Sequence, residues 1–153
     1  MSEKHSCTLA PASCSEDWEA LHDLRRTELF AGKDIIYNPH HPDDFAANHF
    51  PLVFKDQGEC VGTTRLDLLG DGAAAIRLVA ISKKYQRRGY GKILLELLED
   101  RARSHGVSKL FVNARPTAIG YYERFGFRTE DWNDPCGPCV GIFKDCVPMA
   151  KNI

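Results

Sequence analysis

The chain has 153 residues, which suits one domain, and we treat residues 1–153 as a single domain. It holds 20 Lys and Arg residues against 21 Asp and Glu residues, and this balance gives no basic face for nucleic acid. The N-terminus lacks the apolar run of a secretory signal, and no apolar stretch reaches the ~20 residues that a membrane span needs. We therefore expect a cytoplasmic protein with neither nucleic-acid nor membrane partners, whose six cysteines are reduced thiols.

The first fifty residues predict a strand, a helix and an irregular segment. Cys7 to Ala10 is a short apolar run that Pro11 ends. A helix is expected from Ser15 to about Phe30, because Ser15 is a suitable N-cap and apolar residues recur at helical spacing, at Trp18, Leu21, Leu24 and Leu29. Residues 31–50 are polar and irregular, with at most one helical turn near their end.

Three strands follow in quick succession, as Pro51 to Lys55, Cys60 to Leu69 and Ala73 to Ile81. They are separated by the turn sequences Asp56-Gln57-Gly58 and Gly70-Asp71-Gly72. Because such short turns reverse the chain, the three strands should be antiparallel neighbours in one sheet.

Beyond these strands, helices and strands are expected to alternate. The expected elements are a helix from Gly91 to His105, a strand from Lys109 to Asn113, a helix from Thr117 to Arg124, and strands from Phe127 to Glu130 and from Val140 to Val147. A right-handed crossover through the first of these helices makes the strand near Leu78 parallel to the strand near Phe111. The sequence thus predicts an α+β fold with a mixed, mostly antiparallel sheet and one parallel strand pair.

A glycine-containing turn separates the third strand from the long helix. Gln86-Arg87-Arg88-Gly89-Tyr90-Gly91 occupies the place where helical N–H groups lack partners and carry partial positive charge. Gly89 and Gly91 would let an anion approach that backbone, and Arg87, Arg88 and Lys92 add positive charge. Alternatively, the two glycines only shape a tight turn. The Walker pattern and the three-glycine dinucleotide pattern are both absent.

The same segment resembles the first signature of the GNAT superfamily of acyl-CoA-dependent N-acyltransferases. That signature is Gln or Arg, two residues, Gly, one residue, then Gly or Ala, and Gln86 to Gly91 matches every defined position. Arg77 to Ile81 is similar to the family's central strand. Asn113 to Phe127 is similar to its second signature, which ends in Tyr, three residues and Gly-Phe. The resemblance covers about residues 50–131, with the two signatures in the expected order.

The resemblance implies a three-layer α/β type of fold, with helices on both faces of the sheet and the parallel strands splayed apart. Family members often carry a bulge there, which the sequence itself does not reveal. Acetyl-CoA would be the cosubstrate. The cofactor-binding residues of the turn would be Gln86, Arg87, Arg88, Gly89, Tyr90, Gly91 and Lys92, with the diphosphate on the backbone amides of Arg87 to Lys92. The pantetheine arm would pair with Val79, Ala80 and Ile81. Asn113 would contact the pantetheine arm, unless it only caps a turn at the end of its strand.

The resemblance also implies direct transfer, in which a neutral amine attacks the thioester carbonyl and a CoA thiolate leaves. Tyr122 matches the family's general acid, and a phenol with a pKa near ~10 is protonated at neutral pH. The alternative is that Tyr122 is an aromatic packing residue at the helix–sheet boundary. Tyr121 is interpreted as a packing or substrate contact. No general base is assigned; residues that could border the acceptor cleft are Glu28, His40, His41 and Asp43.

The segment Cys136-Gly137-Pro138-Cys139 has the four letters of a thioredoxin-type redox site. A redox pair needs a helix N-terminus to lower its thiol pKa, whereas a strand is expected after Cys139. A zinc site would need four ligands, and Cys136, Cys139 and Cys146 supply three. We interpret the motif as a Gly-Pro turn before the last strand, and we expect no metal.

Three functions are therefore compared. The first is an N-acetyltransferase that moves an acetyl group from acetyl-CoA to a primary amine, with a small-molecule acceptor favoured over a protein. The alternative is a non-catalytic acyl-CoA-binding sensor or regulatory domain, and the third is a thiol oxidoreductase. The acceptor site would be shaped by Ala31 to Phe50 and by the final strands. The sequence leaves open whether two copies form a homodimer.

Overall fold

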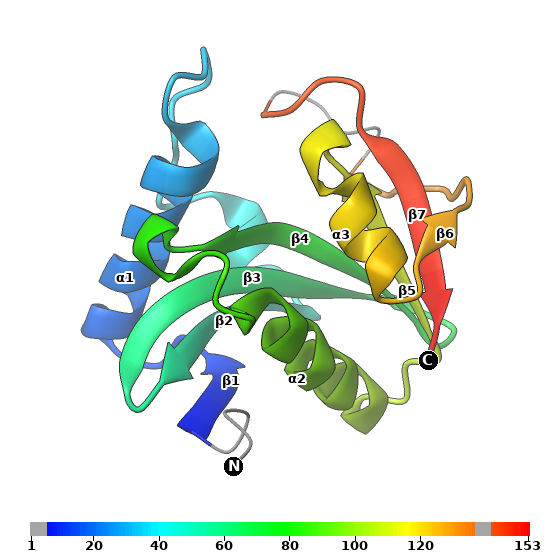
Figure 1. The fold of residues 1–153 in the computed structure, drawn as a ribbon, viewed down its shortest axis with the longest axis horizontal. Coiled ribbons are helices and arrows are strands. Elements are labelled where there is room, and N and C mark those ends of the chain that lie inside the picture. Colours follow the sequence, from blue (N-terminus) through cyan, green and yellow to red (C-terminus); the bar gives the residue numbers. More distant parts are fainter. Residues whose placement is uncertain (1–5, 137–141) are drawn as a thin grey trace.

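The computed structural model describes residues 6–136 and 142–153, and within these ranges seven strands form one mixed sheet (Figure 1). The strand order across the sheet is β1-β2-β3-β4-β5-β7-β6. The strands are β1 Cys7–Pro11, β2 His49–Asp56, β3 Glu59–Gly70, β4 Ala73–Ile81, β5 Lys109–Ala114, β6 Arg128–Thr129 and β7 Val147–Asn152. All pairings are antiparallel except that of β4 with β5, so the predicted topology is confirmed.

The helices lie close to their predicted positions. They are α1 Ser15–Arg25, which continues as a π-helical turn Arg26–Phe30, α2 Tyr90–Ser104 and α3 Ile119–Arg124. Short 3-10 turns cover Pro42–Asp44, Lys83–Tyr85 and Pro116–Ala118. None of these helices in the described part of the chain is long and apolar enough to cross a membrane.

The two faces of the sheet are buried by different chemistry. Along β3, Leu66 points to the face covered by α2 and joins an apolar core with Leu94 and Leu98. Its neighbours Arg65 and Asp67 point to the opposite face, where α1 lies, because side chains alternate along a strand (Figure 1). Each fully buried leucine contributes roughly 1.5–3 kcal/mol, so the apolar face supplies much of the stability. The opposite face holds buried charges instead.

The parallel strands β4 and β5 separate part-way along their length. They pair from Ala73 to Ile76, and beyond that point the β4 edge facing β5 has no strand partner among the described residues. A bulge marks the separation, because Leu78 has a φ of 52° and the β3–β4 register shifts there. The Thr64 hydroxyl donates to the Arg77 carbonyl at 2.8 Å and holds the bulge in place. This bulge gives no signal in the sequence.

The last strand lies further along the chain than predicted. The prediction of a strand from Val140 to Val147 is wrong, because β7 begins only at Val147 and residues 142–146 form no strand. Residues 137–141 of that range lie outside the described residues. Ile142 and Phe143 line a cavity instead, which explains their hydrophobic character.

Candidate active site

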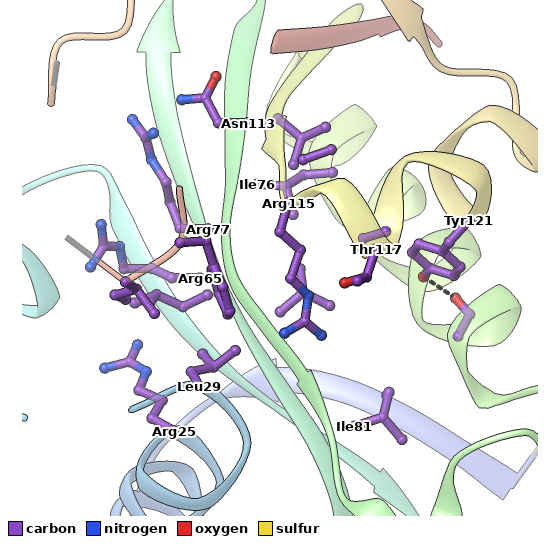
Figure 2. A pocket seen from close by; sticks show the side chains of 18 of the residues that line it. Arg25, Leu29, Arg65, Ile76, Arg77, Ile81, Asn113, Arg115, Thr117 and Tyr121 are labelled. Carbon is purple, nitrogen blue, oxygen red and sulfur yellow. Dashed lines mark hydrogen bonds between the residues drawn. The ribbon is translucent and has the colours of Figure 1, made fainter. Parts of the chain in front are cut away.

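A cavity of about 1110 Å³ opens where β4 and β5 separate (Figure 2). Its walls come from the end of α1, the outer half of β4, the turn before α2, the end of β5 and α3. Most of the predicted site residues line it, namely Val79, Ile81, Gln86, Arg87, Gly89, Tyr90, Gly91, Lys92, Asn113 and Tyr122. Ala80 and Arg88 are not among its lining residues. The fold thus brings both sequence signatures together around one space.

The turn before α2 presents backbone N–H groups at the helix N-terminus. Gly89 is the N-cap and has a φ of 84°, a left-handed conformation that favours glycine. Within the described residues, no hydrogen-bond acceptor is paired with the N–H groups of Arg87, Arg88, Gly89, Gly91 and Lys92. Together with the helix dipole, these groups make an anion-binding end of a helix.

The second glycine of the turn, Gly91, is required by packing. A Cβ at Gly91 would lie 2.8 Å from Cε1 of the Tyr121 ring, and the Tyr121 hydroxyl donates to the Gly91 carbonyl at 2.6 Å. By contrast, a Cβ at Gly89 would meet no atom within 4 Å, so its φ alone favours glycine there. Tyr121 therefore packs against this turn, and because it also lines the cavity, a contact with substrate stays a prediction.

Replacing Gly91 with Ala is expected to lower the free energy of unfolding by about 1–3 kcal/mol, because the Tyr121 ring must move. Urea denaturation measures the change. In a Tyr121→Ala background the same replacement should cost nothing or stabilise, since Ala favours helix over Gly by about 1 kcal/mol. An equal loss in both backgrounds would contradict the packing explanation.

The side chain of Gln86 fixes the turn to its surroundings. Its Nε2 donates to the Ile81 carbonyl at 2.9 Å and to a carboxylate oxygen of Glu28 at 3.4 Å. The other Glu28 oxygen accepts the Lys83 N–H at 3.3 Å. Gln86 therefore joins the end of β4 to the turn after α1. Glu28, one of the residues considered as a base, has these structural contacts and does not line the cavity.

Tyr122 combines a packed ring with a position in the cavity wall. It is 4% exposed and makes edge-to-face contacts with Tyr121 and Phe127. Burial raises the pKa of Tyr122 far above its ordinary value, while the charge of Arg115 acts in the opposite direction. The phenol is therefore protonated at neutral pH, as a proton donor must be.

Asn113 lies at the end of β5 and faces the splayed part of β4 across the cavity. Its side-chain amide donates to Asp134 at 2.7 Å. Asp134 in turn accepts two hydrogen bonds of 2.6 Å from Arg77. Asn113 is therefore held by a charged pair and still lines the cavity, where its other polar atom can contact a ligand.

The sequence profile of the Acetyltransferase (GNAT) family matches residues 18–127. The chain belongs to this family. A Bacillus subtilis (strain 168) protein named as an acetyltransferase is 32% identical over 78 residues, which cover 51% of this chain and 52% of that protein. The GNAT chain thus spans about half the length of that relative.

Solved structures support the GNAT fold. A protein described as an N-acetyltransferase from Lactobacillus plantarum has a TM-score of 0.76 at 21% identity, over 96% of this chain and 98% of that one. N-acetylglutamate synthase from Neisseria gonorrhoeae, solved with coenzyme A and L-arginine, has a TM-score of 0.71 at 19% identity, over 96% of this chain and 33% of that one. The predicted three-layer fold with a splayed parallel pair is confirmed.

Along one wall of the GNAT cavity lies a network of alternating arginines and aspartates, four of them buried and two half-buried, which are not among the predicted site residues; all but Asp67 line the cavity. In spatial order they are Arg25, Asp44, Arg65, Asp67, Arg77 and Asp134. Figure 2 shows the side chains of Arg25, Arg65 and Arg77 on the same side of β4. Three positive and three negative charges balance, so this charge network is nearly neutral as a whole.

The geometry of the charge network is that of charge-assisted pairs. Arg25 donates to both oxygens of Asp44 at 2.8 and 3.1 Å, and Arg65 donates to Asp44 at 3.3 Å. Arg65 also donates to both oxygens of Asp67 at 2.8 and 3.1 Å, and Arg77 donates to Asp67 at 3.2 Å. Because guanidinium groups pair with two carboxylate oxygens at once, the network fixes α1, β3 and β4 relative to one another.

A partial signal for this network exists in the sequence. Arg65 and Asp67 are opposite charges two positions apart within an apolar strand, so they share one face of the sheet. Their partners Asp44 and Asp134 come from irregular segments whose positions no periodic pattern predicts.

The residues considered as bases are distributed unevenly. His41 and Asp43 line the cavity and His40 does not.

Tyr37 also lines the cavity. The hydroxyl oxygen of Tyr37 accepts from Arg25 at 3.2 Å and lies 2.5 Å from Nδ1 of His22. The Tyr37 hydroxyl and His22 Nδ1 therefore share a hydrogen bond whose direction is set by the His22 tautomer. Burial lowers the pKa of His22, helped by Arg25, so this imidazole is neutral and can accept a proton.

The cysteine motif gains no support as a redox site. Desolvation raises the pKa of the Cys136 thiol, although the charge of Arg77 acts in the opposite direction, and a raised pKa weakens a redox thiol. Cys139 lies outside the described residues. Within the part of the chain that is described, no group of three or more His, Cys, Asp or Glu side chains could hold a metal ion.

Proposed function

We propose that this GNAT protein transfers the acetyl group of acetyl-CoA to a primary amine of a small molecule. One observation carries the proposal, namely the convergence of three features on one cavity. These features are the N–H groups at the start of α2, the open edge of β4 and the Tyr122 phenol.

The cavity has features that suit both halves of acetyl-CoA. Arg87 and Lys92 line it at the helix N-terminus, where a diphosphate would be held, and Arg124 of α3 also lines it. The open edge from Val79 to Ile81 can hydrogen-bond an extended amide chain, as an added strand would. The volume of about 1110 Å³ exceeds that of ordinary small-molecule pockets, which leaves room for an acceptor beside the pantetheine arm.

The residues around the cavity have the chemistry for direct transfer. Acetyl-CoA supplies a thioester, whose carbonyl carbon the neutral amine attacks. Backbone N–H groups near the bulge at Leu78 can stabilise the charge that develops on the carbonyl oxygen. Tyr122 donates a proton to the departing thiolate. The proton of the attacking amine passes to water or to the Tyr37–His22 pair.

A panel assay tests the proposal. The purified protein, saturated with acetyl-CoA, is offered amines, amino acids, polyamines, aminoglycosides and peptides, and release of the CoA thiol is followed. We expect release with at least one small amine. Tight binding of CoA by calorimetry without release on any amine would instead support a non-catalytic sensor.

A cytoplasmic location belongs to the same proposal. No two of the described cysteines form a disulfide with each other, which suits a reducing compartment; they are Cys7, Cys14, Cys60, Cys136 and Cys146. Cell fractionation with an antibody to the protein tests this location.

A further inference from the structure

Arg115 is a cation in the cavity wall that has no acidic partner. It follows β5 directly, and Figure 2 shows its side chain reaching into the open space near Thr117. Arg115 is half-buried, lines the cavity and forms no ion pair with any Asp or Glu of the described residues. Its guanidinium lies 4.7 Å from the centre of the Phe143 ring. A cation placed in this way attracts an anion that the cavity receives from outside.

The other arginines near it cannot serve that anion. Arg25, Arg65 and Arg77 are each bonded to carboxylates of the charge network, and the charges there cancel. Asp43 is the one remaining carboxylate among the described lining residues, and it lies 3.8 Å from a ring nitrogen of His41. Arg115 is therefore an uncompensated cation in this part of the cavity wall, and Lys33, which does not line the cavity, adds a second positive charge 4.8 Å from the centre of the same Phe143 ring.

The anion that Arg115 attracts belongs on the acceptor side. The helix N-terminus has cations of its own for a diphosphate, in Arg87 and Lys92. Arg115 instead follows β5 and contacts Phe143, which precedes β7, so it belongs to a different wall of the cavity from the turn before α2. Tyr122 of α3 lines the same cavity.

An apolar wall of the cavity includes Phe143, the residue that Arg115 contacts. It is made by Leu29, Phe30, Ile35, Ile36 and Phe143. Ile36 is 92% exposed although it belongs to this wall, so an apolar group of a ligand would cover surface that water now contacts. The wall and the cation meet at Phe143, which contacts Arg115.

We propose that the acceptor amine also carries a carboxylate, which Arg115 binds, and an apolar group, which packs against Ile35, Ile36 and Phe143. The acceptor is then an apolar amino acid or a close analogue of one. This inference rests on the proposed acetyltransferase function and narrows its substrate class. Charge-assisted hydrogen bonds between a guanidinium and a carboxylate give both affinity and orientation to such an amine.

Matched pairs of amines test the proposal. L-leucine is compared with 3-methylbutylamine, and L-phenylalanine with 2-phenylethylamine, so each pair differs by one carboxylate. Values of kcat/KM, corrected for the fraction of neutral amine, should favour the amino acid by about 10- to 100-fold in the wild-type enzyme. In Arg115→Gln the kcat/KM of the amino acid should exceed that of its decarboxylated partner by no more than about threefold. Arg115→Lys should retain part of the wild-type preference.

The ratio within each pair separates the proposed role from others. An effect of Arg115 on Tyr122 or on acetyl-CoA changes both amines of a pair equally and leaves the ratio intact. Arg128→Gln, an exposed change on β6, is the matched control and should keep the wild-type preference. Circular dichroism checks that the variants are folded.

Three results would overturn the inference. Equal kcat/KM values for both members of each pair in the wild type would remove it while leaving the acetyltransferase function standing. A preference that survives in both Arg115 variants would assign the carboxylate to another residue. Failure of the wild type to acetylate any amine in the wide panel would remove the proposed function and this inference together.

Discussion

Replacing Asp44 with Asn is expected to lower the free energy of unfolding by about 3–5 kcal/mol. The Asp44 side chain is 1% exposed and accepts from Arg25 and Arg65, which are themselves 1% and 7% exposed. The variant keeps the shape of the side chain but leaves Arg25 as a buried cation without a carboxylate. Domains of this kind have a total stability of about 5–15 kcal/mol, so this one change would remove a large part of it. Urea denaturation monitored by circular dichroism measures the loss.

An exposed ion pair is the matched control for this experiment. Asp23 lies 3.5 Å from Arg26 on the surface of α1, and its side chain is 65% exposed. Asp23→Asn should change the free energy of unfolding by no more than about 0.5 kcal/mol, because water screens such pairs. Similar losses for the two variants would mean that burial does not strengthen the charge network.

The pH dependence of stability gives a second measurement on Asp44. Burial raises the pKa of Asp44, but the hydrogen bonds and charges of Arg25 and Arg65 outweigh this and hold it below its ordinary value of 3.8. A carboxyl with a lowered pKa contributes its stability above the unfolded pKa and loses it as the pH falls through the folded pKa. Wild-type stability should therefore decline below about pH 4, and the decline should be shallower in Asp44→Asn.

The fold could be predicted from the sequence because its main features are periodic. Apolar spacing located the helices that end near Phe30 and Ser104, and the turns at Gly58 and Gly72 ordered the antiparallel strands. The bulge at Leu78 could not be predicted, since it depends on how β3 and β4 pair rather than on a residue type. The last strand was misplaced because apolar residues that line a cavity resemble a buried strand.

The part of the candidate site that binds through the backbone of a sequence motif could be predicted. The part formed by side chains from distant segments could not. The glycine turn could be predicted because its signature is a short local pattern. The reason for a glycine at position 91, which is the packing of the Tyr121 ring on Gly91, could not be predicted from that pattern. Arg115 stands two residues after Asn113 and gives no signal in the sequence, because an arginine at a strand end is ordinarily solvated. Its significance depends on the absence of a carboxylate among the described residues around it.

Replacing Tyr122 with Phe is expected to lower kcat by about 10²- to 10⁴-fold while the affinity for acetyl-CoA stays unchanged. The ring packs edge to face against Tyr121 and Phe127, and Phe keeps those contacts. A role in packing alone therefore predicts near-normal kcat in this variant, whereas a proton donor predicts a large loss. Steady-state kinetics with an accepted amine, together with calorimetry of CoA binding, separate the two roles.

The neighbouring tyrosine provides the control for this change. The Tyr121 hydroxyl donates to the Gly91 carbonyl, so Tyr121→Phe should cost about 0.5–1.5 kcal/mol of stability and change kcat by less than about threefold. The pH profile adds a further constraint. Because burial raises the pKa of Tyr122 above its ordinary value, its ionisation should not reduce kcat up to about pH 10. The contradicting result would be a wild-type kcat that falls at high pH with an apparent pKa of about 8–9, together with a Tyr122→Phe variant in which this fall is absent. Such a result would mean that the Tyr122 phenol ionises more readily than its burial allows.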